Sequence, residues 1–509
     1  MSGNLFSLIR ARTERVSAPF IVSPTGQATS YEAAFAESAK LANLLVSKGV
    51  KPGDRVAVQV EKSARALMLY LACLRVGAVY LPLNTGYTLA EMEYFIGDAE
   101  PRVVVCDPAK LAGISALARE LGVAHVETLD RNGIGTVSEE SGDLATEFSD
   151  VERTGDDLAA ILYTSGTTGR SKGAMLTHAN LTSNASVLKG SWRFTADDVL
   201  LHALPIFHTH GLFVATNVTL MAGSSMVLLP KFDPDEIFRL LPGATTMMGV
   251  PTFYTRLLDD PRLTRETTAN MRLFVSGSAP LLAETHRAWE QRTGHRILER
   301  YGMTETNMIT SNPYEGERIP GSVGPALSGI SVRVCDPETG AAKPAGEVGM
   351  IQVKGPNVFK GYWRMPEKTA AEFTPDGYFI TGDLGKIDDN NYVSIVGRGK
   401  DLVISGGYNV YPKEVETEID AMDGVFESAV IGVPHHDFGE GVTAVVVLNK
   451  GANLDEKGVL SVLESKLAKY KLPKRVLFVD ALPRNTMGKV LKNELRQTYK
   501  DLYALKRAV

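Results

Sequence analysis

The sequence predicts an α/β fold with a largely parallel sheet in its first part. Over the first 150 residues, segments whose apolar side chains recur with helical spacing alternate with short apolar segments typical of buried strands. Parallel strands need a crossover between them, usually a helix, so this alternation favours α/β layers. The chain has 509 residues, enough for roughly two to four domains, because a single hydrophobic core stops growing at roughly 250–300 residues.

The elements follow from these patterns in chain order. Helices are predicted at Tyr31–Lys48 and Ala64–Val76, and the N-terminal segment is predicted to be an ordinary first helix, not a targeting sequence. Strands are predicted at Arg55–Val60, Val79–Leu83, Arg102–Cys106 and Leu158–Tyr163. The stretch Gly133–Asp157 is polar and acidic, and we expect it to be a surface connection.

Composition and charge exclude several classes of protein. Hydrophobic residues make up 44% of the chain and charged residues 22%, the balance of an ordinary soluble globular protein. The net charge of −5 gives no reason to expect nucleic acid or an anionic membrane as a partner. Cys73, Cys106 and Cys335 are too few and too scattered for a disulfide framework or a zinc cluster. We therefore expect a cytoplasmic protein with no nucleic-acid or membrane partner.

A loop rich in glycine and hydroxyl side chains, YTSGTTGRSKG at residues 163–173, follows the last predicted strand. Glycine lets backbone N–H groups turn toward an anion, and hydroxyls with one ammonium add donors for phosphoryl oxygens. The residues expected to bind phosphate are Thr164, Ser165, Gly166, Thr167, Thr168, Gly169 and Lys172. The pattern is not a P-loop, because Gly173 follows Lys172. Taken alone, it is equally typical of an ordinary surface loop.

Six more motifs follow at wide separations. They are HALPIFHTHG (202–211), SGSAPL (276–281), ERYGMTE (299–305), TGDLG (381–385), GRGKDLVISGGYNVYPKEVE (397–416) and PRNTMGKV (483–490). Together with the phosphate loop, their order and spacing resemble the signature of the acyl-adenylate-forming superfamily, which includes acyl-CoA synthetases, luciferases and adenylation domains. The resemblance covers essentially the whole chain.

The resemblance implies a fold of two domains and a reaction in two steps. Residues 1–397 would form a large domain of stacked mixed β-sheets flanked by helices, and residues 398–509 a small mobile α+β domain, with the active site between them. In this superfamily a carboxylate attacks the α-phosphate of ATP, with Mg²⁺ bound, to give an acyl adenylate and pyrophosphate. A thiol then takes the acyl group.

The motifs also imply roles for individual residues. Tyr301 would stack on adenine, Thr304 would touch the α-phosphate, and Glu305 would hold Mg²⁺ together with Thr164. Asp383 would accept both ribose hydroxyls, since a carboxylate offers two acceptor oxygens. The other positions expected to bind nucleotide or coenzyme A are Gly277, Ser278, Ala279, Glu299, Gly302, Arg398, Lys400, Gly406 and Gly407.

Lys489 is the residue expected to catalyse adenylation, with Thr304 and His208 assisting. Its ammonium would stabilise charge that develops on the bridging phosphate oxygen and on the attacking carboxylate. The alternative is a solvated loop lysine, the usual state of any one lysine. Lys400 is expected at the hinge, where the small domain turns between the two steps. No tethered carrier domain is expected after the lysine motif, so coenzyme A is favoured as the acceptor.

The acid is predicted from the residues of the acyl pocket. His208, Arg256, Ser278, Met303 and Arg287 are expected there, and a cation in an enclosed pocket suggests a second anionic group on the substrate. The segments HALPIFHTHGLF, GVPTFYTRLL and RYGMTETNM are similar in sequence to segments of malonyl-CoA synthetases, and this resemblance favours malonate. Methylmalonate, a small monocarboxylate, a luciferase-like use of the adenylate and a non-catalytic nucleotide-binding module stay open. So does the choice of Arg256 or Arg287 for the distal carboxylate, since Arg256 in a helix is also typical of a solvated face.

Overall fold

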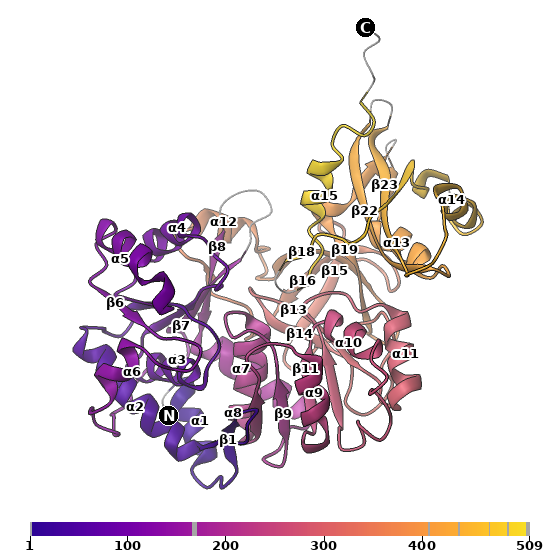
Figure 1. Cartoon of the computed structure of the whole chain (residues 1–509). Helices are drawn as coiled ribbons and strands as arrows, with labels where there is room; N and C mark the ends of the chain where they lie inside the picture. The colour runs from indigo at the N-terminus through magenta and orange to yellow at the C-terminus, as the bar shows by residue number, and fades with distance from the viewer. Residues whose placement is uncertain are drawn as a thin grey trace.

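The protein is seen in a computed structural model that describes residues 3–164, 171–405, 408–435, 438–467, 469–485 and 488–504. Two large sheets with their helices form the lower part of the molecule in Figure 1, and the C-terminal part of the chain stands above them. The mixed sheets flanked by helices confirm the predicted fold class.

The first large sheet has seven strands in the order β17-β8-β7-β4-β3-β5-β6. Their bounds are β3 Arg55–Gln59, β4 Val79–Pro82, β5 Val103–Cys106, β6 His125–Thr128, β7 Leu158–Thr164, β8 Lys172–Thr177 and β17 Gly361–Tyr362. Strands β7, β4, β3, β5 and β6 are parallel, and β8 is antiparallel to β7. This is the parallel sheet predicted from the first 150 residues, and the predicted strand positions agree with it to within one residue at either end.

The second large sheet has eight strands in the order β14-β13-β12-β11-β9-β10-β1-β2. Their bounds are β1 Pro19–Val22, β2 Ala28–Ser30, β9 Val199–His202, β10 Ser225–Leu228, β11 Thr246–Gly249, β12 Leu273–Ser276, β13 Leu298–Met303 and β14 Asn307–Ser311. Strands β1, β10, β9, β11, β12 and β13 are parallel, while the edge strands β2 and β14 are antiparallel to their neighbours.

Two smaller sheets complete the strands. One is an antiparallel sheet in the order β15-β16-β18-β19, with bounds β15 Ser331–Cys335, β16 Gly349–Lys354, β18 Phe379–Ile387 and β19 Val393–Arg398. The other contains β20 Val403–Ser405, β21 Tyr408–Val410, β22 Val425–His435, β23 Gly439–Leu448 and β24 Arg475–Phe478. The strands after Arg398 thus pair only with one another among the described residues. The domain boundary at residues 397 and 398 stays a prediction.

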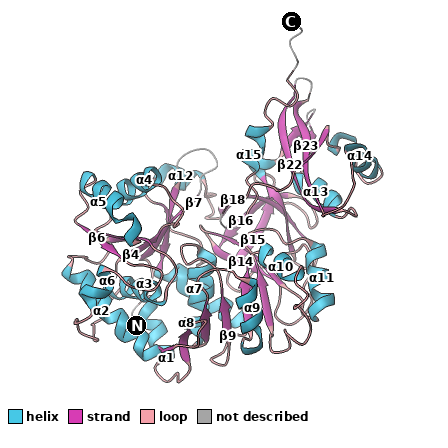
Figure 2. Cartoon of the chain, in the orientation of Figure 1, coloured by secondary structure: helices cyan, strands magenta, loops and turns pink. Residues whose placement is uncertain are grey.

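Helices cover both faces of the two large sheets (Figure 2). Their bounds in the first half are α1 Leu5–Thr13, α2 Tyr31–Ser47, α3 Ala64–Val76, α4 Leu89–Ala99, α5 Leu111–Glu120, α6 Thr136–Ser141, α7 His178–Ser191, α8 Asn217–Ala222 and α9 Pro234–Leu240. Those in the second half are α10 Pro251–Leu258, α11 Ala283–Thr293, α12 Pro366–Ala371, α13 Pro412–Asp420, α14 Glu456–Glu464 and α15 Lys492–Thr498. One π-helical turn, η2 His210–Thr216, precedes α8.

Side-chain alternation along the strands explains why helices lie on both faces. Val56 and Val58 of β3 pack into the core between the two sheets, whereas Ala57 packs with α4 and α5 on the outer face. In the second sheet, Leu200 faces the shared core and Leu201 packs with α9, α10 and α11. The order of layers is therefore helices, sheet, shared core, sheet, helices.

The central helix α3 is buried along most of its length, because its sequence ARALMLYLACLRV is apolar on almost all sides. The side chain of Ser63 caps its start, and Gly77, with φ of 76°, ends it in the left-handed conformation that favours glycine. The structure matches the predicted bounds of this helix. It differs for the connection predicted at Gly133–Asp157, which contains α6, a short helix that buries Val137 and Ser141.

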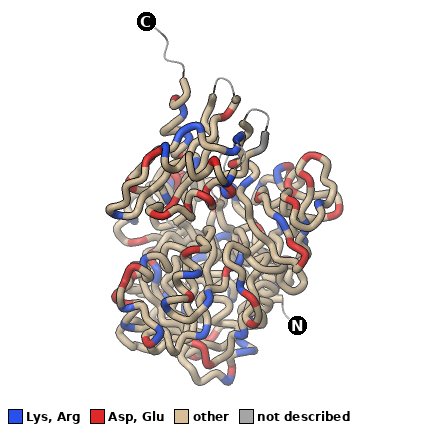
Figure 3. Tube along the Cα trace, turned by 90° about the vertical axis from the view of Figure 1, so that its right-hand side faces the viewer, with Lys and Arg blue, Asp and Glu red and all other residues tan. Residues whose placement is uncertain are grey.

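Basic and acidic residues are interspersed along the trace in Figure 3. This mixture agrees with the small net charge of −5. Among the described residues, none of the helices has both the length and the apolar character required to cross a membrane.

Candidate active site

The sequence motifs meet at one edge of the second large sheet. Gly249 at the end of β11 pairs with Ser276 at the end of β12, and Ser276 pairs with Glu299 of β13. The segments VPTFYTR, SGSAPL and ERYGMTE therefore reach the same edge. Ligands of open α/β sheets bind at the carboxyl ends of parallel strands, so this edge is the expected place for a site.

The nucleotide end of the site is organised around the Asp383 carboxylate. The Tyr301 hydroxyl donates a hydrogen bond to its Oδ2, and the Arg398 guanidinium lies 3.1 Å from its Oδ1. Asp383 and Arg398 face one another because β18 and β19 pair at this register. The structure thus brings together three of the residues predicted to bind the nucleoside.

Glu305 lies in a network that reaches the phosphate loop. The Tyr362 hydroxyl lies 3.0 Å from Glu305 Oε1 and 2.6 Å from Glu372 Oε2. Glu372 in turn forms an ion pair of 3.1 Å with Lys172, whose ammonium lies 4.1 Å from the centre of the Tyr362 ring. Lys172 is therefore held beside Glu305 at the start of β8.

Glu305 fits the role of a magnesium ligand. Its side chain is buried, 6% exposed, and burial raises its pKa, although the nearby Lys172 ammonium acts in the opposite direction. A divalent cation would relieve that cost. The described residues contain no group of three or more His, Cys, Asp or Glu side chains that could hold a metal ion, and Mg²⁺ is usually held by one or two carboxylates together with phosphate oxygens. Thr164, at the end of β7, stays a predicted second ligand.

The segment ERYGMTE also carries a buried arginine that was not among the predicted site residues. Arg300 on β13 is 4% exposed, and its Nε and Nη2 have no hydrogen-bond partner among the described residues. Burial lowers its pKa to about 9, so the guanidinium remains charged at neutral pH. A Cβ on Gly277 would lie 2.3 Å from its Cζ, so the guanidinium lies directly against the Gly277 backbone. Among the described residues, two nitrogens of this buried cation therefore lack a protein partner.

Two neutral histidines lie near this cation. Burial, with a smaller contribution from the Arg300 charge, lowers the pKa of His208 to about 4 and that of His210 well below its usual value. The Nδ1 of His210 lies 3.2 Å from Ser278 Oγ, and its Nε2 is buried without a partner in the described structure. These groups add donors and acceptors to the pocket without adding charge.

Ser278 adopts φ of 71°, a conformation that side chains other than glycine rarely take. Such strain persists only where the surroundings hold it, and it is frequent at functional sites. Here it places the Ser278 hydroxyl against His210, between the SGSAPL and HALPIFHTHG segments.

Other predicted positions lie apart from this pocket. Arg256 is exposed in the last turn of α10, and Arg287 is exposed on α11. Both assignments rested on an enclosed cation, and neither side chain is enclosed, whereas Arg300 is buried. Glu299 is buried with its Oε1 3.4 Å from His286 Nδ1. Its nucleotide role stays a prediction, as do those of the partly buried Ala279, Gly302, Met303 and Thr304.

Lys489 reaches the nucleotide end from the C-terminal part of the chain. The Arg398, Asp383 and Lys400 charges all act on it, and burial lowers its pKa to about 8. Its backbone N–H donates to Asn485 Oδ1 at 2.9 Å. A Cβ on Gly488 would lie 3.2 Å from Thr252 Oγ1, so the lysine segment rests on the first turn of α10. The lysine is therefore close to the residues that organise the nucleoside end.

Comparison with known proteins identifies the family. Residues 9–363 match the family described as AMP-binding enzyme, and residues 414–489 match the AMP-binding enzyme C-terminal domain. The chain belongs to this family.

Solved structures extend the likeness to the whole chain. ATP-bound MatB from Rhodopseudomonas palustris is 64% identical, covers 99% of this chain and 100% of its own, and superposes with a TM-score of 0.97. The apo form of MatB is also 64% identical and covers 99% of this chain and 100% of its own. It superposes with a lower TM-score of 0.87. This AMP-binding enzyme therefore has its parts arranged more nearly as in the ATP-bound form. Lys400 as the hinge stays a prediction.

Characterised relatives share about a third of their residues with this AMP-binding enzyme. Malonate–CoA ligase of Mus musculus is 37% identical over 90% of this chain and 84% of its own length. Feruloyl-CoA synthase of an Amycolatopsis species is 36% identical over 93% of this chain and 94% of its own. The relatives thus differ in the acid that they are named for.

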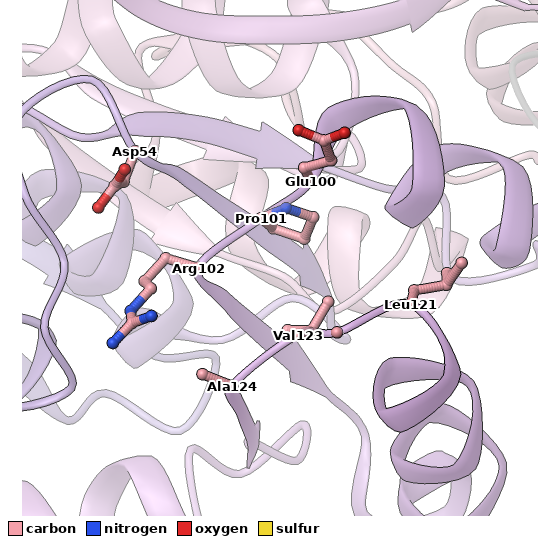
Figure 4. Close-up of a pocket in the computed structure, with 8 residues that line it drawn as sticks. Asp54, Glu100, Pro101, Arg102, Leu121, Val123 and Ala124 are labelled. Atoms are coloured by element: carbon pink, nitrogen blue, oxygen red, sulfur yellow. The ribbon is translucent and has the colours of Figure 1, made fainter.

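Several predicted nucleotide-binding positions lie outside the described residues. They are Ser165, Gly166, Thr167, Thr168, Gly169, Gly406 and Gly407. Two cavities away from the motifs are not part of the site. The one in Figure 4 has a volume of about 200 Å³ and contains Arg102 and Ala124, which precede β5 and β6, so it lies at the amino ends of the strands.

The low pKa of Lys489 predicts that ATP binding takes up protons. Near pH 8 the free AMP-binding enzyme has this amine partly neutral, and phosphate oxygens favour the ammonium, so ATP raises its pKa. Above the free pKa, the Kd for ATP should therefore increase by up to about tenfold per pH unit. Calorimetric titration in two buffers of different ionisation enthalpy measures this uptake. Lys489→Ala should abolish it; equal uptake in the variant would assign it to another group.

Proposed function

We propose that this AMP-binding enzyme is an AMP-forming malonate–CoA ligase. It activates malonate with ATP to malonyl-AMP and pyrophosphate, and then transfers the malonyl group to coenzyme A. The observation that carries the proposal is the buried, charged Arg300 guanidinium near His208, His210 and Gly277, whose Nε and Nη2 have no partner in the described part of the chain. A buried cation of this kind is costly unless a ligand pairs with it.

A short diacid supplies that pair. One carboxylate of malonate would meet Arg300, because a guanidinium binds a carboxylate with two parallel hydrogen bonds. The other carboxylate would then point toward the nucleotide end, where Lys489 and the Asp383–Arg398 pair lie. Malonate–CoA ligases among the relatives support this reading.

The chain's own residues then divide the work of adenylation. Asp383 would orient the ribose, held in place by Tyr301 and Arg398. Glu305 would hold Mg²⁺, which when bound neutralises charge on the phosphates. The Lys489 ammonium would stabilise charge on the attacking carboxylate and the bridging oxygen. Lys172 would break its ion pair with Glu372 and bind the phosphates of ATP.

The rival acids differ in charge and size. A feruloyl-CoA synthase is among the relatives, but an aromatic monoacid would leave Arg300 unpaired in an enclosed pocket. A small monocarboxylate has the same defect. Methylmalonate keeps both carboxylates and adds one methyl group, so it is the second candidate. The three cysteines are buried free thiols, which supports a reducing, cytoplasmic location.

A substrate panel tests the proposal. Pyrophosphate release is measured with malonate, methylmalonate, acetate, propionate and ferulate, each with and without coenzyme A. We expect the highest kcat/KM for malonate and formation of malonyl-CoA only when coenzyme A is present. A higher kcat/KM for any of the monoacids would overturn the proposed substrate.

A further inference from the structure

Lys62 is a buried lysine that none of the substrate contacts above involves. It lies between β3 and α3 and is 7% exposed. Its Nζ donates to the carbonyl oxygens of His202 at 2.6 Å and Leu204 at 2.8 Å, and lies 2.8 Å from His202 Nδ1. Across the described chain, no carboxylate forms an ion pair with it. Such an arrangement requires an explanation, because an unpaired buried amine is rare.

The hydrogen bonds of His202 determine how Lys62 is bound. The His202 Nε2 lies 2.9 Å from the carbonyl oxygen of Gly211, which can only accept, so Nε2 carries the hydrogen and Nδ1 is an acceptor. Lys62 Nζ thus faces three acceptors, the full donor capacity of an ammonium. Burial lowers the pKa of this amine, and the three acceptors favour the charged form against that cost.

Lys62 and His202 together connect the two arms of one loop. Lys62 holds the outgoing arm at His202 and Leu204, and His202 holds the returning arm at Gly211. The arms touch closely: a Cβ on Gly211 would lie 2.0 Å from the carbonyl oxygen of Pro205. Between them, the tip of the loop carries His208 and His210.

The same contacts join the two large sheets. Lys62 follows β3 of the seven-stranded sheet, while His202 ends β9 of the eight-stranded sheet. One ammonium thus fixes the position of the acyl-pocket loop relative to the neighbouring sheet. Among the described residues, its hydrogen bonds go to His202 and to the loop backbone.

We propose that Lys62 is a positioning residue for acid binding, which acts through His202 to hold the Ala203–Gly211 loop with His208 and His210 beside Arg300. The proposal rests on the proposed function for the identity of the acid. It predicts that loss of the Lys62 contacts weakens acid binding selectively. The nucleotide contacts at Asp383 lie on β18 and β19, outside this loop.

The test is a comparison of KM values in Lys62→Met. This change removes three donors, and a displacement of about 1 Å in a positioned group can cost about 10²-fold. We expect the KM for malonate to rise about 10- to 100-fold while the KM for ATP changes less than about threefold. Lys62→Gln, whose amide keeps two N–H donors, should show a smaller rise, and it replaces Lys62→Met if that variant does not fold.

Arg75→Met is the matched control. Arg75 is another buried cation, at the end of α3, and it pairs with Asp150 at 2.6 Å away from the loop. The Arg75→Met substitution should lower the Tm of the enzyme without raising its KM for malonate. The proposal is overturned if malonate and ATP KM rise in parallel, if neither rises, or if Arg75→Met has the same effect. The unmodified enzyme is measured first. If it rejects malonate, the proposed function fails by itself, and the Lys62 comparison is made with the acid that it accepts.

Discussion

Lys489→Ala is expected to reduce the rate of acyl-AMP formation about 10²- to 10³-fold, the usual cost of removing one group that stabilises transition-state charge. The lysine lies within the field of Asp383, Arg398 and Lys400, and its pKa of about 8 shows a partly dehydrated amine. Dehydration strengthens its interaction with phosphate, since less water competes for the charge.

The measurement separates the two half-reactions. Pyrophosphate release reports adenylation, and supplied malonyl-AMP with coenzyme A reports thioester formation, which we expect to stay largely intact. Lys466→Ala is the control, since this lysine pairs with Glu418 on the surface of the same C-terminal region. An equal loss of both half-reactions would mean that Lys489 has a different role or that the fold is damaged.

Arg300→Met should lower kcat/KM for malonate by about two to three orders of magnitude. Truncating one partner of a buried charge pair costs roughly 2–5 kcal/mol, and methionine fills part of the space without leaving a donor unpaired. Activity toward acetate and propionate should fall much less and can rise, because these acids have no second carboxylate to pair with the cation that the substitution removes. Sites built around a buried polar partner discriminate in this asymmetric way.

The control for this prediction is Arg256→Met, at the exposed position on α10. It should leave the ratio of malonate to acetate activity unchanged. Parallel losses for both acids in Arg300→Met would make Arg300 structural. If Arg256→Met loses activity toward malonate but not toward acetate, Arg256 binds the distal carboxylate, as first predicted.

Local patterns were enough to predict much of the fold. Helix α3 and strands β3, β5 and β7 were predicted because apolar runs bounded by capping residues and glycines define them within a few positions. The motif resemblance predicted nucleoside roles for Tyr301, Asp383 and Arg398, and the structure brings the three side chains together, although Tyr301 and Asp383 are 82 residues apart in sequence. Their hydrogen bond was not predicted, and their nucleoside roles stay predictions.

The proposed role of Arg300 was not predicted, and a comparison of α10 with β13 explains why. On α10, Tyr254 and Leu257 are buried, and helical spacing places Arg256 away from them. On β13, Arg300 and Tyr301 are neighbours, and within this motif only Met303 was predicted to line the acyl pocket. Whether a strand residue faces solvent or a pocket depends on the layers that cover it, which local sequence does not define. The Lys62 contacts were missed for the same reason, since they join two sheets.

The alternation of side chains along β13 also separates substitutions on one face of the strand from substitutions on the other. Consecutive residues of a strand point to opposite faces, so Arg300 lies toward His208 and Gly277 while Tyr301 faces Asp383. A substitution at position 300 can therefore change which acid is recognised without removing a nucleotide contact. Relatives of this chain are named for malonate and for ferulate. Under the proposed function, one face of β13 would determine which acid is bound, and the other face would hold the residues that bind ATP.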